Sequence, residues 1–133
     1  MKAVIDTNVI ISALLWGGQP RRVIDYARSG HYHALTSPAL LAELKRVLSQ
    51  RFALPQARVE MALRSTLSYS EMILPVEEIE TPVRDPGDIK VIACAIAGGA
   101  DIIITGDRDL LDLVQVGGIR IVSVSEFLAG RVS

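Results

Sequence analysis

Short apolar segments alternate with helical patterns along the whole chain, and this alternation constrains the fold most strongly. Strands are predicted at Val4–Ile5, His33–Thr36, Met72–Val76, Ile102–Ile104 and Ile119–Val122. The run Ile102–Ile104 is apolar at every position, which is typical of a strand covered on both faces. The alternation therefore predicts a three-layer α/β/α sandwich around a mainly parallel sheet of about five strands.

Capping residues mark the helices between these strands. Ser37 and Pro38 suit the cap and first turn of a helix, and Gly98-Gly99 suits a helix end. The predicted helices are Thr7–Leu15, Arg21–Ser29, Ala39–Arg51, about Pro55 to Ser68, Asp85 to Ala97, Asp107 to about Val114, and a final turn through Leu128. A polar connection is expected over Glu77–Arg84.

Length and composition indicate a single folding unit. The chain has 133 residues, half of them hydrophobic, which is enough for one sizeable core. It shows no internal repeat, so residues 1–133 are interpreted as one domain. The single cysteine excludes a disulfide framework. No apolar run is long enough for a membrane span, and the N-terminus does not resemble a signal peptide, so we expect a cytoplasmic protein.

Charge is unevenly distributed although the net charge is only −1. Residues 1–70 carry nine Lys/Arg and four Asp/Glu, whereas residues 71–133 carry five Lys/Arg and eleven Asp/Glu. A nearly neutral total argues against a protein that coats duplex DNA by charge alone. The asymmetry is compatible with an acidic site beside a basic rim.

Acidic residues follow several of the predicted strands. Asp6 comes directly after the first strand, and Asp107 and Asp109 follow the Ile102–Ile104 strand. Asp88 lies in the first turn of its helix, and Glu43 in the second turn of the helix after the second strand. Because ligands of parallel sheets bind at the carboxyl ends of the strands, we expect these acids at one edge of the sheet.

Each acid also has an ordinary structural explanation. Asp6, Asp85 and Asp107 suit helix N-caps, Asp88 suits a first-turn acid, and Glu43 suits an ion pair with Arg46. Taken together, however, the acids need a compensating charge, since two carboxylates about 5 Å apart repel by roughly 3 kcal/mol at an effective dielectric constant near 20. Mg²⁺ or Mn²⁺ would supply that charge and could activate water for phosphodiester hydrolysis.

Four motifs occur in order along the chain. They are Asp6-Thr7-Asn8 after Val4-Ile5, Ser37-Pro38 with Glu43, Asp88 before Ile92-Ala93-Cys94-Ala95, and Ile104-Thr105-Gly106-Asp107-Arg108-Asp109. This series resembles the PIN-domain family over about residues 4–127, in particular the toxin-like (VapC-like) nucleases of toxin–antitoxin pairs. The resemblance implies an α/β/α fold and metal-dependent endoribonuclease activity, commonly in a homodimer that a small antitoxin holds inactive.

The resemblance also implies roles for individual residues. Asp6, Glu43, Asp88 and Asp107 match the acidic quartet, Asp109 matches a supplementary acid, Thr7, Asn8 and Thr105 match polar residues lining the site, and Asp85 matches an acid near the third motif. Our mechanistic hypothesis is that Asp6, Asp88 and Asp107 bind Mg²⁺ or Mn²⁺. Glu43 then orients or deprotonates the attacking water.

RNA is expected to be guided by basic residues from the first half of the chain: Arg21, Arg22, Lys45, Arg46 and Arg51. The aromatic residues are scattered along the sequence, at Trp16, Tyr26, Tyr32, Phe52, Tyr69 and Phe127. We therefore expect shape and phosphate contacts to matter more than base stacking.

Two other functions remain as alternatives. An RNA-binding or regulatory module without turnover is one, because Ile89 stands where relatives often carry Asn and Ala93-Cys94 replaces a stretch often containing Glu. A phosphatase or receiver-like domain with Asp6 as phosphoryl acceptor is the other. It is disfavoured because Asn8 stands where a second aspartate is expected.

Overall fold

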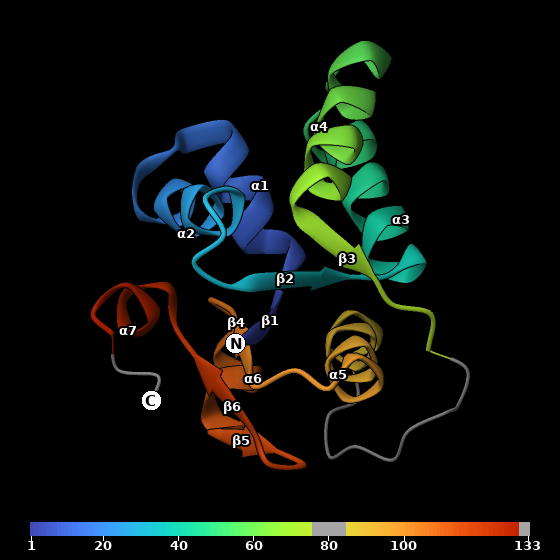
Figure 1. Ribbon diagram of the computed structural model, residues 1–133. Helices are drawn as coiled ribbons and strands as arrows, with labels where there is room; N and C mark the ends of the chain where they lie inside the picture. Colours follow the sequence, from blue (N-terminus) through green and yellow to red (C-terminus); the bar gives the residue numbers. More distant parts are fainter. Residues whose placement is uncertain (76–84, 131–133) are drawn as a thin grey trace.

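The computed structural model of the protein describes residues 1–75 and 85–130, and a six-stranded sheet lies at its centre (Figure 1). The strands are β1 (Lys2–Ile5), β2 (His33–Thr36), β3 (Ser70–Met72), β4 (Ile102–Ile104), β5 (Gln115–Val116) and β6 (Ile119–Val122). Their order in the sheet is β3-β2-β1-β4-β6-β5. All neighbours are parallel except β5 and β6, so the predicted α/β class with a mainly parallel sheet is confirmed.

Helices cover both faces of this sheet (Figure 1). They are α1 (Thr7–Trp16), α2 (Gly18–Arg28), α3 (Pro38–Arg46), α4 (Gln56–Tyr69), α5 (Pro86–Gly98), α6 (Arg108–Leu113) and α7 (Val124–Leu128), with a π-helical turn η1 (Val47–Arg51) continuing α3. Among the described residues, no helix has both the length and the apolar character needed to cross a membrane.

Alternation along each strand divides the core between the two faces. Ile5 of β1 and Ile104 of β4 pack on one face with α1, α2 and α7, whereas Val4 and Ile103 pack on the other face with α5 and α6. Successive side chains of a strand point to opposite faces, so an all-apolar strand needs cover on both. This packing accounts for the uninterrupted apolar run that the sequence shows at Ile102–Ile104.

The third strand differs from its prediction. Met72–Val76 was expected, but β3 is Ser70–Met72 and follows α4 directly. The reason lies in the pairing partner, because Met72 is already opposite Thr36, the last residue of β2. Beyond this point there is no partner strand to pair with. Val76 and the predicted connection Glu77–Arg84 lie outside the described residues.

Two helices also depart in detail from their predicted limits. The helix predicted at Arg21–Ser29 begins earlier, at Gly18, with Pro20 at its third position, where a backbone donor is not yet required. The helix predicted at Ala39–Arg51 has nearly the expected extent. Its last turn is π-helical, however, and Phe52 N donates to Val47 O at 3.2 Å. Such turns are frequent at functional sites.

The strand β5 was not predicted at all. It forms a hairpin with β6 through Gly117 and Gly118, whose φ angles are +55° and +81°. Two consecutive residues with positive φ make the turn type that matches the twist of a hairpin, and glycine adopts this conformation without strain. The sheet therefore has six strands rather than about five.

The order of the strands places a switch point at β1. The chain passes from β1 to β2 on one side and later returns to β4 on the other side, so the carboxyl ends of β1 and β4 are neighbours. Ile5 pairs with Ile104, which brings Asp6 next to Thr105. In open parallel sheets, ligands bind beside such a point.

Candidate active site

An acidic pocket of about 340 Å³ lies at this edge of the sheet. The strand end after β1, the helix pair α3–η1 and the N-termini of α5 and α6 each contribute to it. The lining residues are Asp6, Asn8, Glu43, Arg46, Val47, Gln50, Arg51, Asp85, Gly87, Asp88 and Asp107. All four acids of the predicted quartet thus meet in one pocket, although they span about a hundred positions of the sequence.

Asp6 is held at the bottom of the site by the neighbouring strand. Its side chain is 6% exposed, and the buried hydroxyl of Thr105 donates to Asp6 Oδ2 at 2.6 Å. Asp6 occupies the N-cap position of α1, but its side chain makes no capping hydrogen bond there. Burial raises the pKa of Asp6, while the hydrogen bond from Thr105 acts in the opposite direction. The Thr105 hydroxyl lowers this pKa more than the backbone N–H of Asn8 in the first turn of α1 does, so capping alone does not explain the placement of the carboxylate.

Asp88, Asp107 and Asp109 form a compact cluster beside Asp6. One carboxylate oxygen from each lies within 4.8 Å of the others. The pKa of Asp88 is raised to about 7, first because the group is buried and then because of its hydrogen bond with Asp107 and the charges of Asp107, Asp85 and Asp6. Burial is therefore the largest cause of the raised pKa of Asp88, and the neighbouring carboxylates add to it.

The helix-capping explanations for two of the acids are confirmed. Asp85 Oδ1 accepts a hydrogen bond from Gly87 N at 2.7 Å, and Asp107 Oδ1 accepts one from Asp109 N at 2.8 Å. Asp107 nevertheless belongs to the carboxylate cluster as well. Capping and a place in the cluster are therefore compatible, because each cap uses one oxygen of a carboxylate that has two.

Glu43 reaches the pocket from α3. Its side chain is 17% exposed, and Glu43 Oε1 lies 3.9 Å from Arg46 Nη2, so the predicted ion pair is present. Gly87 of α5 also approaches this carboxylate closely. A Cβ added at Gly87 would lie 3.0 Å from Glu43 Oε1 and 3.1 Å from Asp85 Oδ1. The absence of a side chain at position 87 leaves room for Glu43 in the site.

The other predicted site residues divide into two groups. Asn8 lines the pocket, but Thr7 and Thr105 are buried, and Thr105 supports Asp6 from beneath the surface. Of the five predicted guiding residues, Arg46 and Arg51 line the acidic pocket. Arg22 and Lys45 are exposed on α2 and α3 and are not among its lining residues, and Arg21 lies at a different pocket.

Three lining residues were missed in the sequence: Val47, Gln50 and Gly87. For two of them a signal existed, because Val47 and Gln50 follow Glu43 by four and seven positions. Residues at this spacing share one face of a helix. A helix that carries Glu43 toward the site therefore carries both of them as well. Gly87 had no such signal, since its role depends on a contact with another helix.

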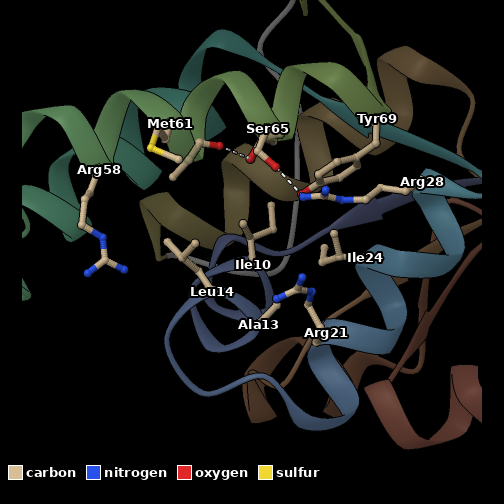
Figure 2. Close-up of a pocket in the computed structure, with 12 residues that line it drawn as sticks. Ile10, Ala13, Leu14, Arg21, Ile24, Arg28, Arg58, Met61, Ser65 and Tyr69 are labelled. Carbon is tan, nitrogen blue, oxygen red and sulfur yellow. Dashed lines mark hydrogen bonds between the residues drawn. The ribbon is translucent and has the colours of Figure 1, made fainter.

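A second pocket, of about 350 Å³, lies between α1, α2 and α4 (Figure 2). Its surface is largely apolar, with Ile10 and Leu14 from α1 and Met61 from α4. Arg21, Arg28 and Arg58 also line it, and none of the acidic residues that the structure describes does. Arg28 donates to Ser65 Oγ, and its guanidinium lies 5.6 Å from the centre of the Tyr69 ring.

Cys94 does not take part in either pocket. Its side chain is buried in the core on α5, and burial raises the pKa of its thiol to about 11. A thiol with such a pKa is not a nucleophile at neutral pH. The prediction that Cys94 is a core residue is confirmed.

Comparison with known proteins supports the assignment of the fold. The sequence model of the PIN domain matches residues 2–109. The uncharacterized protein MJ1680 of Methanocaldococcus jannaschii is 36% identical over 118 residues, which cover 85% of this chain and 75% of that protein.

Two solved structures have the same fold. One is VapBC2 from Rickettsia felis bound to a DNA fragment from its promoter, with a TM-score of 0.68 and 15% identity, covering 92% of this chain and 98% of that chain. The other is VapBC-1 from nontypeable Haemophilus influenzae, with a TM-score of 0.66 and 16% identity, covering 94% and 99%. The chain belongs to the PIN-domain family of nucleases, because the family model matches most of its length and its fold agrees with that of these structures.

Proposed function

We propose that this protein is a metal-dependent endoribonuclease that hydrolyses RNA phosphodiester bonds by means of an activated water. The observation that carries the proposal is the meeting of Asp6, Glu43, Asp88 and Asp107 in one pocket at the switch point of the sheet. Four separate segments supply these acids, so ordinary helix capping does not account for their convergence. Membership of a nuclease family agrees with this chemistry.

The donor set fits a hard divalent cation. The groups are carboxylates, which Mg²⁺ and Mn²⁺ prefer, and one oxygen from each of Asp88, Asp107 and Asp109 lies within 4.8 Å of the others. Burial and the neighbouring carboxylates raise the pKa of Asp88, which supports a need for compensating positive charge at this site. Asp6, Asp88 and Asp107 would hold the ion, and Asp109 would hold its waters. When bound, such an ion lowers the pKa of water and neutralises developing negative charge.

The remaining pocket residues position water and substrate in this proposal. Glu43 accepts the proton of the attacking water, and its ion pair with Arg46 orients the carboxylate for that task. Arg46 and Arg51 contact phosphates of the RNA on the side of the pocket formed by α3 and η1. The chain thus provides a base and two phosphate contacts, and no nucleophilic side chain is required.

Gly87→Ala tests the position of Glu43. The added Cβ would come within 3.0 Å of Glu43 Oε1, so the carboxylate has to move by a few tenths of an ångström. We expect cleavage to fall by about tenfold, because small displacements of a catalytic group are costly. Rates are compared at saturating Mn²⁺. Gly106→Ala is the matched control, since a Cβ there meets nothing within 4 Å. Equal rates for both variants would remove Glu43 from the mechanism.

We further propose that the protein is the toxin of a toxin–antitoxin pair. Its fold is that of chains in the VapBC2 and VapBC-1 structures. The pocket between α1, α2 and α4 suits the partner, because its apolar surface and three arginines are complementary to an acidic amphipathic segment (Figure 2). A homodimer, the state common in the family, is part of the proposal and is tested by sedimentation velocity.

Growth measurements test the toxin proposal. Induced expression of the wild-type chain in a bacterial host is expected to arrest growth, whereas expression of Asp6→Asn at the same level is not. Continued growth with the wild type, at an expression level that gives measurable RNA cleavage in extracts, would show a nuclease that is not a toxin. Arrest by Asp6→Asn would show toxicity unrelated to the acidic pocket.

A further inference from the structure

Two aromatic side chains that are far apart in the sequence meet at the end of α1 that is remote from Asp6. The ring centroids of Trp16, at the end of α1, and Phe52, directly after η1, are 6.0 Å apart with an interplanar angle of 75°. This edge-to-face arrangement is a favourable one for aromatic pairs. The sequence places the aromatic residues far apart, and the fold brings these two together.

Arg51 connects this pair to the acidic pocket. Its guanidinium lies 5.6 Å from the centre of the Phe52 ring, and Arg51 itself lines the pocket that contains Asp6 and Glu43. Arg51 therefore lies in space between the acidic cluster and the aromatic pair. The π-helical turn η1 brings Arg51 and Phe52 to this position at the end of α3.

Trp16 contributes little of its surface to the core. The residue is 70% exposed, whereas Phe52 is half-buried against the cluster formed by α1, α3 and α4. An indole ring with this exposure is not explained by the packing of the fold. The contact with Phe52 holds the indole, and most of the residue remains open to solvent.

We propose that Trp16 is a stacking platform for a base of the single-stranded RNA whose scissile phosphate lies at the acidic pocket. The inference rests on the proposed ribonuclease function and adds a binding position to it. Aromatic side chains combined with a basic groove are the common means of binding single strands, because every base has a face that can stack.

The length of α1 sets the distance between the platform and the site of cleavage. The nine steps from Thr7 to Trp16 rise about 14 Å along the helix, and Thr7 follows Asp6 directly. At about 3.4 Å per stacked nucleotide, this distance corresponds to roughly four nucleotides. Phosphates between the two points pass Arg51, so a dinucleotide reaches the acids without reaching Trp16, whereas an octamer reaches both.

Fluorescence tests the contact directly, because Trp16 is the only tryptophan of the chain. The Asp6→Asn protein is titrated with a single-stranded octaribonucleotide and with an abasic oligomer of the same length. We expect the octamer to quench the emission of Trp16, and the abasic oligomer to leave it unchanged even where it binds. Binding of the octamer without quenching would overturn the inference.

Kinetics provide the second test. With the octamer as substrate, Trp16→Ala is expected to raise KM about 5- to 100-fold, which is the effect of losing one stacked base. Trp16→Phe keeps an aromatic ring and is expected to have a KM close to that of the wild type. With a dinucleotide, all three proteins should have the same KM. The matched control is Leu74→Ala, which removes another exposed apolar side chain that lines neither pocket.

The outcomes separate this inference from the proposed function. Cleavage of the octamer with an unchanged KM in Trp16→Ala would refute the platform and leave the ribonuclease assignment intact. A changed oligomeric state of Trp16→Ala in sedimentation velocity, with an unchanged KM for the octamer, would assign the indole ring to a protein interface. That result would also refute the platform. Failure of the wild type to bind or cut any RNA would overturn both.

Discussion

Replacing Asp6 by asparagine is expected to lower the rate of RNA cleavage by about a thousandfold or more, while the protein stays folded. The carboxylate is a proposed ligand of the catalytic ion, whose stabilisation of developing charge is worth several kcal/mol. The asparagine side chain still accepts the hydrogen bond that Thr105 donates at 2.6 Å, so the local structure is preserved. Single-turnover cleavage of a panel of RNAs at saturating Mn²⁺ measures the effect.

The stability of this variant separates a catalytic role of Asp6 from a structural one. Burial raises the pKa of Asp6 in the folded protein, so the ionised side chain destabilises the metal-free fold at neutral pH. Asp6→Asn should therefore melt at the same temperature as the wild type or higher in EDTA. Asp25→Asn is the control, since Asp25 is exposed on α2 and paired with Arg21. A large drop in melting temperature for Asp6→Asn would assign the carboxylate a structural role.

The second large effect concerns the pH dependence of stability, which we expect to be dominated in the metal-free protein by Asp88. Its pKa is about 7 in the folded protein and near 3.8 when unperturbed. The folded state therefore binds more protons than the unfolded state between these values. Protonated Asp88 therefore contributes to the free energy of unfolding. This contribution is fully present below about pH 4 and is lost as the pH rises through 7.

The loss attributable to Asp88 is up to about 4 kcal/mol in the free energy of unfolding between pH 4 and pH 8. Asp88→Asn removes this contribution, because an amide does not ionise and can still donate a hydrogen bond to Asp107. Urea denaturation in EDTA at several pH values measures the difference between wild type and variant. Asp112→Asn on α6, which is exposed, controls for a general change in charge.

Divalent cations are expected to reverse the loss of stability that the metal-free protein shows as the pH rises. Because the ligands bind in their ionised form, Mn²⁺ should stabilise the wild type more at pH 8 than at pH 5. It should have little effect on Asp88→Asn at either pH. A wild-type protein whose stability does not fall between pH 5 and pH 8 in EDTA would contradict the view that the acids are uncompensated.

Much of the candidate site could be predicted because it depends on local patterns. A carboxylate directly after a buried parallel strand has to lie at the carboxyl edge of the sheet, which places Asp6. The capping roles of Ser37, Asp85 and Asp107 follow from residue type and position, and each is present. Periodicity along the helix also places Val47 and Gln50 on the same face as Glu43.

The features that the sequence did not reveal depend on contacts between distant segments. The limits of β3 are set by where β2 ends, not by the apolar residues that follow Met72. The distinction between Arg51, which lines the acidic pocket, and Arg21, which lines the other one, depends on how α2 and α3 pack. The meeting of Trp16 with Phe52 likewise depends on the packing of α1 against the end of η1.

A metal titration of RNA cleavage tests the central claim most directly. Purified wild-type protein and Asp6→Asn are incubated with a panel of RNAs in EDTA and in increasing Mn²⁺ or Mg²⁺. We expect cleavage by the wild type that rises with metal, vanishes in EDTA and is absent in Asp6→Asn. Cleavage by the wild type that persists unchanged in EDTA, or RNA binding unaffected by chelator with no cleavage at millimolar metal, would contradict the account. The second of these results would favour a PIN-domain protein that binds RNA without turnover.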